Sequence, residues 1–221
     1  AILRFEDLDT EKVYFTMSGS MIKTDVLRRM NKQIQENTFF VDVEFILFPV
    51  PYIQTVTFIS AFIYKYSRGN KEQSVFIPNM IKRYDHHDRV MRRVIEYRIN
   101  TEMSDSQAKY YDSVLKRVLY THYGLCTFYN DNKAEGYIRM ADFDRFLIHT
   151  YPEMAKWVGR SIPIVKAARK ADYNYRKVKY SFGNLCLFSK KQAKTIIVSN
   201  RKIIKPLIKN RFTYRIASSI A

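Results

Sequence analysis

The positive charge of this chain is concentrated toward its C-terminal end. The 221 residues include 38 Lys and Arg against 21 Asp and Glu, a net charge of +17. Residues 154–221 contain 17 Lys or Arg and a single acid, Asp172, whereas residues 1–153 contain 21 basic and 20 acidic residues. Such an asymmetry constrains partners and association rather than fold. We therefore expect the basic third to meet an acidic partner.

The basic third is also rich in residues that normally become buried. Disordered basic arms contain few aromatic or β-branched residues. This segment instead holds Trp157, a series of Tyr and Phe, and apolar groups at 162–165 and 195–198. In its most basic stretch, 169–180, tyrosines alternate with cations. We expect this third to be folded, or to fold on its partner.

Length and composition are those of an ordinary globular protein. A chain of 221 residues can bury a real core as one large domain or two small ones. Only 6 residues are glycine, which argues against Gly-rich phosphate loops and flexible linkers. The pattern predicts a mainly α fold with a small β component (α+β), bundle-like in its middle and C-terminal regions. We expect a mixed α/β region at 1–80, a helical core at 81–160 and a basic helical region at 161–221, which together form one continuous domain.

The strand signals lie in the first third of the chain. Apolar residues alternate with Asp42 and Glu44 along 39–48, which indicates the clearest strand. Residues 53–67 are ambiguous, because their β-branched residues favour a strand whereas their length and Pro-initiated start slightly favour a buried helix. The other elements expected here are a strand at 12–17, a helix from an N-cap at Thr24 to Glu36, a turn at 68–71 and a short extended piece at 74–77.

Helical spacing dominates from about residue 84 onward. The strongest element begins at Ser104, a good N-cap, and its apolar residues recur every three or four positions until Gly124. A loop is expected at 123–137, with a short extended piece at 127–129. The other helices expected here are 85–99, 140–150, 152–159, 163–179 and 190–204.

The sequence contains no familiar catalytic or nucleotide-binding motif. Walker A, G-x-G-x-x-G, H-E-x-x-H and G-x-S-x-G patterns are all missing. The run 85–88 includes two adjacent histidines, but neighbours on a helix point in different directions, so a helix-start cap by Asp85 is favoured over a metal site. Asp142 and Asp144 are expected in the first turn of a helix, where acids complement the helix dipole. We expect a non-enzymatic protein without a cofactor or bound metal.

Two cysteines, Cys126 and Cys186, are too few for a disulfide-rich secreted framework. No apolar run reaches the roughly 18 residues of a membrane span, and the start of the chain already carries charges, so we expect neither a span nor a secretory signal. These features predict an intracellular, reduced protein. Cys126 has no cationic neighbour in sequence, which favours an inert buried thiol. A bridge from either cysteine to another chain is the alternative use.

The basic third has three interpretations. It binds nucleic acid, with its cations on phosphates and its tyrosines stacked on bases. Alternatively it binds copies of the same chain, whose other part offers acidic spots such as Asp7, Asp9 and Glu44. A solvated basic face without a role ranks lowest, because its positive charges repel one another and would destabilise the fold without any functional gain. The residues expected to contact a polyanion or another subunit are Arg169, Lys170, Tyr173, Tyr175, Arg176, Lys177, Lys179, Lys190, Lys191, Arg201 and Lys202.

The chain is rich in Tyr, Lys and Arg and poor in Gly, as shown by 173–180 and the pair Tyr110 and Tyr111. In composition and size it resembles polyhedrin-like occlusion-body proteins of insect viruses. The resemblance implies a crystalline matrix around virions that is stable near neutral pH and dissolves in alkali, in the nucleus or cytoplasm of a host cell. Tyr and Lys have ordinary pKa values of about 10 and 10.4, so alkali would change the charges of packed contacts.

The leading hypothesis is therefore a non-enzymatic, self-assembling viral structural protein. It would form a lattice or occlusion-body-like matrix through electrostatic and aromatic contacts between copies. The alternative is a nucleic-acid-binding protein of nucleocapsid or replication type that uses the same residues.

Overall fold

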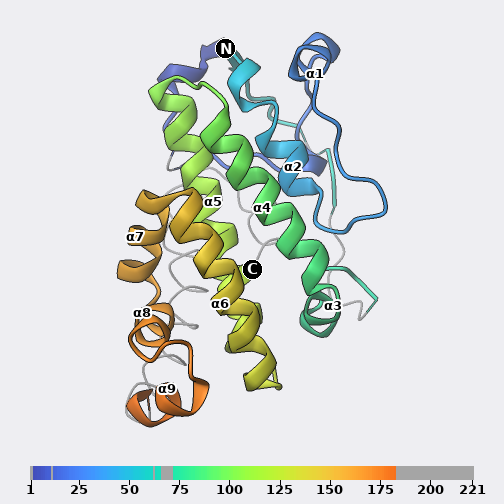
Figure 1. Ribbon diagram of the computed structural model, residues 1–221. Coiled ribbons are helices and arrows are strands. Elements are labelled where there is room, and N and C mark those ends of the chain that lie inside the picture. Colours follow the sequence, from blue (N-terminus) through green and yellow to red (C-terminus); the bar gives the residue numbers. More distant parts are fainter. Residues whose placement is uncertain (1, 11, 62, 66–71, 183–221) are drawn as a thin grey trace.

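The computed structural model describes residues 2–10, 12–61, 63–65 and 72–182, with only the backbone described for 179–182. Three long helices, α4, α5 and α6, pack side by side, with α7 and α8 along one side and the short N-terminal elements along the other (Figure 1). The described strands and α-helices are β1 (Ile2–Arg4), α1 (Thr24–Met30), α2 (Asp42–Leu47), β2 (Thr55–Thr57), α3 (Ile77–Lys82), α4 (Tyr84–Asn100), α5 (Asp105–Cys126), α6 (Lys133–Thr150), α7 (Pro152–Ser161), α8 (Pro163–Lys170) and α9 (Tyr175–Phe182). Short 3-10 helices cover Phe5–Asp7, Met17–Gly19 and Val50–Tyr52. The predicted fold class, mainly helical with a small β component, is confirmed.

The core lies between the long helices. One cluster of buried apolar residues extends from Phe5 near the N-terminus to Val178 in α9. Tyr110 and Tyr111 of α5 are both fully buried, and the Tyr111 hydroxyl donates to the carbonyl of Val94 in α4, 2.8 Å away. These tyrosines therefore serve the core, where a buried ring needs a partner for its hydroxyl. Among the described helices, none has both the length and the apolar character needed to cross a bilayer.

The start of α5 is as predicted. The Ser104 hydroxyl accepts from the N–H of Gln107, and the Gln107 side chain accepts from the N–H of Ser104, which together form a capping box. The end differs slightly, because α5 passes through Gly124 and stops at Cys126. The helix predicted at 85–99 is also confirmed as α4.

The segment 39–48, predicted as the clearest strand, contains the short helix α2 instead. Its expected outer face is not exposed, because Glu44 is fully buried. The Glu44 carboxylate accepts from the Arg93 guanidinium at 3.0 Å and from the Gln35 side-chain amide at 2.7 Å. The ion pair joins α2 to α4, and such a tertiary contact cannot be read from the alternation of a few residues.

The prediction for 53–67 is also wrong. Thr55–Thr57 form the strand β2, and the remaining residues described in this segment are not helical. β2 pairs antiparallel with β1, and Leu3 lies opposite Val56. The β-branched residues thus adopt the strand that they favour once a partner strand from the N-terminus is available.

Three smaller predictions in the first third need correction. Residues 12–16 form a loop rather than a strand, and Met17 begins a 3-10 helix; the Phe15 N–H donates to the Tyr110 hydroxyl of α5 at 3.1 Å. The helix expected to reach residue 36 ends at Met30, because Asn31 has a φ of 43°. Its N-cap position is also one residue earlier than expected and carries no side-chain cap bond.

The remaining predicted pieces of this region have different outcomes. Residues 74–76 form turns rather than an extended piece, and they lead directly into α3. The turn predicted at 68–71 lies outside the described residues.

The loop predicted at 123–137 is much shorter in the structure. α5 ends at Cys126, residues 127–129 form turns instead of an extended piece, and α6 begins directly after its N-cap Asn132. Gly136 permits this tight connection, because a Cβ there would lie 2.1 Å from the carbonyl oxygen of Cys126. The close approach of two helices, rather than a loop signal, explains this glycine.

The later helices are present with different ends. The helices predicted at 140–150 and 152–159 are confirmed within α6 and α7, and both extend beyond the predicted bounds. The N-cap of α4 is Arg83, so Asp85 lies in the first turn and is not the cap that was predicted.

The helix predicted at 163–179 is divided into α8 and α9. Asp172 and Tyr173 between them have φ angles of 46° and 55°, a left-handed conformation that ends a right-handed helix. The Tyr173 N–H donates to the carbonyl of Ala168 at 2.7 Å, and its hydroxyl donates to Asp144 of α6 at 2.6 Å. The end of α8 is therefore closed by a backbone bond to its own last turn and held to α6 by the Tyr173 hydroxyl.

Candidate nucleic-acid interface

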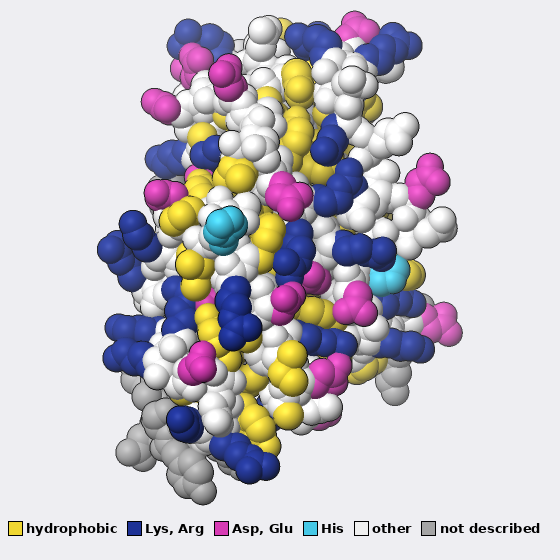
Figure 2. Space-filling model, viewed as in Figure 1, with side chains coloured by type: hydrophobic (Ala, Val, Ile, Leu, Met, Phe, Trp, Pro, Cys, Tyr) yellow, Lys and Arg dark blue, Asp and Glu magenta, His cyan; other side chains and the backbone are white. Residues whose placement is uncertain are grey.

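A row of exposed cations follows the last three described helices. Two cations spaced four residues apart share one face of α7, two share one face of α8, and α9 adds two more. We name this set the basic ridge: Lys156 and Arg160 in α7, Lys166 and Lys170 in α8, and Arg176 and Lys177 in α9, all exposed. Figure 2 shows Lys and Arg side chains along the edge of the molecule where α7 and α8 lie.

The buried faces of α7 and α8 explain why the ridge cations point to water. Each helix carries a stripe of apolar residues three and four positions apart, and this stripe faces the core. The buried residues are Met154, Ala155 and Val158 in α7 and Ile164, Val165 and Ala168 in α8. The cations lie between these positions, so core packing fixes the side of each helix on which they stand.

The ridge charges are not neutralised by their surroundings. Lys156, Arg160, Lys166, Lys170 and Arg176 form no ion pair with a carboxylate of the described residues. Two acids lie in this part of the chain, Glu153 in the first turn of α7 and Asp172 after α8, and both are exposed. Several cations of the long helices have a carboxylate partner instead; Arg98, for example, pairs with Asp112 at 2.9 Å. The ridge therefore presents a positive surface that attracts phosphate groups.

Two of the predicted contact residues, Arg169 and Tyr173, are used inside the fold. Both bind the carboxylate of Asp144, which is fully buried in α6. The Arg169 guanidinium donates two hydrogen bonds of 2.7 Å, and the hydroxyls of Tyr173 and Tyr123 donate one each. Because bidentate, charge-assisted hydrogen bonds are among the strongest in proteins, these side chains are held strongly by Asp144. Both side chains already have partners within the fold, and their contact with a polyanion stays a prediction.

The same cluster corrects the explanation expected for Asp142 and Asp144. Both lie in the middle of α6 and not in its first turn, so the helix dipole does not account for them. Asp142 is exposed and accepts from Arg92 of α4 at 2.6 Å. Asp144 instead joins α5, α6, α8 and the turn before α9.

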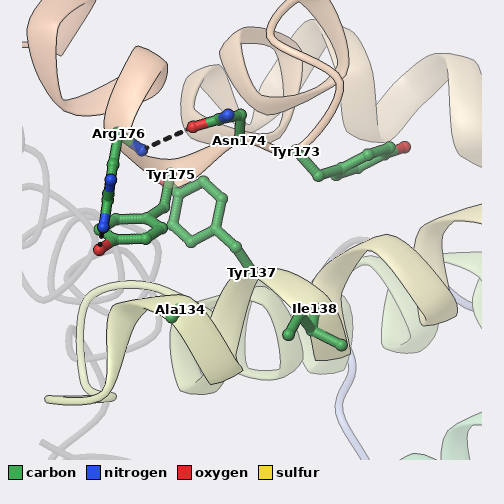
Figure 3. Close-up of a pocket in the computed structure, with 7 residues that line it drawn as sticks. All are labelled: Ala134, Tyr137, Ile138, Tyr173, Asn174, Tyr175 and Arg176. Carbon is green, nitrogen blue, oxygen red and sulfur yellow. Dashed lines mark hydrogen bonds between the residues drawn. The ribbon is translucent and has the colours of Figure 1, made fainter.

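A groove of about 350 Å³ lies between α6 and the turn that leads into α9 (Figure 3). Its walls combine aromatic, aliphatic and cationic side chains, and none of the lining residues is acidic. The lining residues are Ala134, Tyr137, Ile138, Tyr173, Asn174, Tyr175 and Arg176. Two of the predicted contact residues, Tyr175 and Arg176, therefore belong to one hollow in the surface.

Two tyrosine rings lie next to each other at this groove, tilted relative to one another. The ring centroids of Tyr137 and Tyr175 are 6.4 Å apart, with 59° between the ring planes. The Arg176 Nε donates to the Tyr175 hydroxyl at 3.4 Å, and the guanidinium lies 5.9 Å from the centre of that ring. In Figure 3 the Tyr173 side chain points away from this pair. Sequence reasoning missed Tyr137 and Ile138, because only the packing of α6 brings them beside α9.

The predicted histidine cluster contributes to a different, buried site. The Nδ1 atoms of His87 and His122 are 3.0 Å apart, and His122 Nε2 lies 3.1 Å from the Tyr84 hydroxyl. Burial lowers the pKa of His87 to about 4 and that of His122 well below its ordinary value. Both rings are neutral at pH 7, so one Nδ1 donates and the other accepts. In the part of the chain that the structure describes, no group of three or more His, Cys, Asp or Glu could hold a metal ion.

Cys126 belongs to the same buried region. Its side chain is fully buried, and its thiol donates to the Tyr84 hydroxyl at 3.4 Å. Burial raises the pKa of this thiol to about 12. The position agrees with an inert thiol, and a bridge from Cys126 to another chain would require this core to open.

Several predicted residues cannot be placed. The structure does not describe the side chain of Lys179 or the helix predicted at 190–204. Also outside the described residues are Lys190, Lys191, Arg201, Lys202 and Cys186. In contrast, Lys156, Arg160 and Lys166 were not among the predicted contacts. The four-residue spacing of cations along α7 and α8 is the signal that could have identified them.

The acidic spots proposed for contact with another copy are partly used within the chain. Asp7 forms an ion pair with Arg4 at 3.0 Å, and Asp9 forms one with Lys12. Glu44 is fully buried. These three carboxylates therefore offer less attraction to a neighbouring basic surface than the sequence suggested.

No protein-family model, curated protein or solved structure matches this chain. The resemblance to occlusion-body proteins thus stays a prediction based on composition.

Proposed function

We propose that this protein binds nucleic acid, with the cations of the basic ridge on backbone phosphates. The observation that supports this function is the exposure of five cations on three successive helices without a carboxylate partner among the described residues. Lys and Arg that contact phosphates release counterions and provide most of the sequence-independent affinity for nucleic acid. Residues 183–221 add nine Lys and Arg and no acid, so the same end of the chain carries further positive charge.

An extended polyanion suits the ridge better than a small anion. The cations are spread along three helices and are not directed into one pocket. A polymer with regularly spaced phosphates contacts many such charges at once, whereas a small anion contacts one or two. A nucleic acid strand is the polymer whose bases can also use neighbouring aromatic side chains.

Salt-dependent binding tests this function. Fluorescence anisotropy of a short labelled oligonucleotide, titrated with nuclease-treated full-length protein, gives the affinity over a series of salt concentrations. In the ridge variant, Lys156, Arg160, Lys166 and Lys170 are all changed to Gln. We expect the slope of log K against log salt to become shallower by about 0.7 to 0.9 for each lost phosphate contact, with weaker binding to every sequence.

The control variant removes the same number and kinds of charge elsewhere. Lys23, Lys65, Lys82 and Arg89 are exposed and are changed to Gln together. This variant should keep the wild-type slope to within about one contact. Equal losses in both variants, or a wild-type protein that does not bind oligonucleotides, would contradict the proposal. Changing Lys190, Lys191, Arg201 and Lys202 to Gln in a third variant measures the contribution of residues beyond the described part.

Self-association is a second candidate function, and exposed apolar side chains favour it. Ile2 and Met21 are 75% and 78% exposed, and Phe58, Ile59 and Ile63 are more than half exposed. Apolar surface of this kind commonly marks contacts between proteins. Light scattering of nuclease-treated protein tests this candidate. Large particles that persist in the ridge variant but are lost in Phe58→Ser with Ile59→Ser would support it, and a monomer at high concentration would contradict it.

A further inference from the structure

The turn beside the groove is held in an unusual conformation. Asp172 and Tyr173 are consecutive residues with positive φ, a region that residues with bulky side chains rarely occupy. Such strain persists where surrounding contacts over-determine it, and it concentrates at binding sites. Here the Tyr173 hydroxyl is bound to Asp144, and the Asn174 side chain accepts from the N–H of Arg176 at 3.1 Å. The groove wall is therefore fixed before any ligand arrives.

The groove offers a surface for a flat apolar ring with a negative group beside it. Tyr175 provides the aromatic surface and contacts the buried ring of Tyr137, and Ile138 lies on α6 with 71% of its surface exposed. Arg176 lies at the rim and is also a member of the basic ridge. A nucleotide, with a planar base and an adjacent phosphate, has this combination of properties.

We propose that this groove receives one unpaired nucleobase of a strand whose phosphates lie on the basic ridge. The role of the groove rests on the proposed nucleic-acid binding and assigns it a substrate class, single-stranded nucleic acid. Bases stack on aromatic side chains in proteins that bind single strands, with little dependence on sequence. In a duplex the bases are stacked within the helix, so one can enter the groove only after unpairing. The protein therefore prefers single strands to duplexes of the same length.

A pair of matched substitutions on one helix tests the groove. Ile138→Glu places a carboxylate at the groove, where it repels the phosphate beside the base. Ile148→Glu makes the same change of charge on an exposed residue of α6, about 15 Å further along the helix axis. The probes are labelled oligo(dT) and a duplex of the same length. We expect Ile138→Glu to weaken oligo(dT) binding about tenfold, whereas Ile148→Glu changes it less than about twofold.

A second pair of variants separates the ring from its hydroxyl. Tyr175→Leu removes the aromatic surface, and Tyr175→Phe keeps the ring while removing the hydroxyl that accepts from Arg176. One lost stacking contact corresponds to roughly five- to 150-fold weaker single-strand binding. We expect that loss for Leu and less than about twofold for Phe, with an unchanged salt slope in both because no phosphate contact is removed. Circular dichroism and the thermal midpoint confirm that each variant is folded.

The outcomes distinguish failure of the groove from failure of the proposed function. Equal binding of oligo(dT) by Ile138→Glu and Ile148→Glu, or equal losses for oligo(dT) and duplex, would overturn the groove assignment while salt-dependent binding remained. A protein that shows no salt-dependent binding to either probe would overturn both. Ultraviolet crosslinking of oligo(dT) followed by mass spectrometry gives a direct test, and we expect the crosslink at Tyr175.

Discussion

The interior of the fold and the basic ridge both carry charged residues, but the interior pairs its charges whereas the ridge exposes them. In α2 and α6 the fully buried carboxylates of Glu44 and Asp144 each have an arginine partner. On the ridge the cations face water, and five of them have no carboxylate partner among the described residues. Arg169 and Lys170 are neighbours in sequence, yet one points into the fold and the other out of it. The comparison shows that one run of cations in a sequence contains both side chains that are bound within the fold and side chains that remain exposed to a partner.

The largest expected effect concerns alkali and the buried tyrosines of the long helices. Burial raises the pKa of Tyr84, Tyr110, Tyr111 and Tyr123 above the ordinary value. Above about pH 10 the unfolded chain loses these protons while the folded chain keeps them, so stability falls as pH rises. Each tyrosine contributes about 1.4 kcal/mol per pH unit in this range.

We therefore expect the isolated chain to unfold between about pH 10 and pH 12, which circular dichroism across this range measures. Dissolution of an assembly in alkali would then follow from unfolding and would not identify contacts between copies. A native circular dichroism spectrum at pH 12 would contradict this prediction, because the buried tyrosines of the long helices would then not limit the stability of the fold in alkali.

The next largest effect is expected for Asp144. Replacing it by Ala leaves the Arg169 guanidinium without its partner in a mostly buried position, which should lower the free energy of unfolding by about 3 to 5 kcal/mol. Asp142→Ala on the same helix is the control, because its exposed ion pair with Arg92 should contribute less than about 1 kcal/mol. Urea unfolding compares the two. Similar losses would show that burial does not decide the contribution of these carboxylates.

A smaller effect is expected in mild acid. The pKa of His87 is lowered to about 4 by burial, whereas it is about 6.5 in the unfolded chain. Below about pH 6.5 the unfolded state binds more protons, so stability decreases as pH falls toward about 4, and His122 acts in the same direction. Each histidine contributes up to about 1.4 kcal/mol per pH unit. Urea unfolding at pH 7 and pH 5 measures the loss. Replacing the exposed His149 by Asn should leave the loss unchanged, and equal stability at both pH values would contradict the burial of the pair.

The smallest effect is expected for the ridge itself. Lys166→Gln combined with Lys170→Gln should change the free energy of unfolding by less than about 0.5 kcal/mol, because neither side chain has a carboxylate partner among the described residues. The same double variant should weaken oligonucleotide binding. Thermal unfolding and anisotropy together test this separation. A loss of stability as large as that of Asp144→Ala would mean that the ridge cations support the fold.

The outcomes of the element predictions depend on where each element obtains its stability. Residues 85–99 and 104–124 carry long apolar stripes and, at Ser104, a local cap, so their helices are visible in the sequence. Residues 39–48 and 53–67 are short, and the conformation of each depends on a partner that is distant in sequence. The partner of 39–48 is Arg93, and the partner of 53–67 is β1. A period measured over so few residues does not distinguish a strand from a short helix.

The residues of the candidate site also fall into two groups: those that the sequence identifies and those whose role depends on packing. Tyr175, Arg176 and Lys170 could be selected from sequence because basic and aromatic residues gather there. Arg169 and Tyr173 lie in the same basic and aromatic stretch, but both side chains are hydrogen-bonded to the buried carboxylate of Asp144 on another helix. Tyr137 and Ile138 join the groove only because α6 packs beside the turn into α9.

By itself the sequence determined the mainly helical class, the long amphipathic helices and the end of the chain at which positive charge accumulates. These properties depend on residue type and on spacing over one or a few turns, which the sequence displays directly. Only the tertiary structure decided which cations remain available, where α8 stops and which rings form the groove. Each of those outcomes depends on contacts between residues far apart in sequence, above all the buried carboxylates that select their own arginine partners.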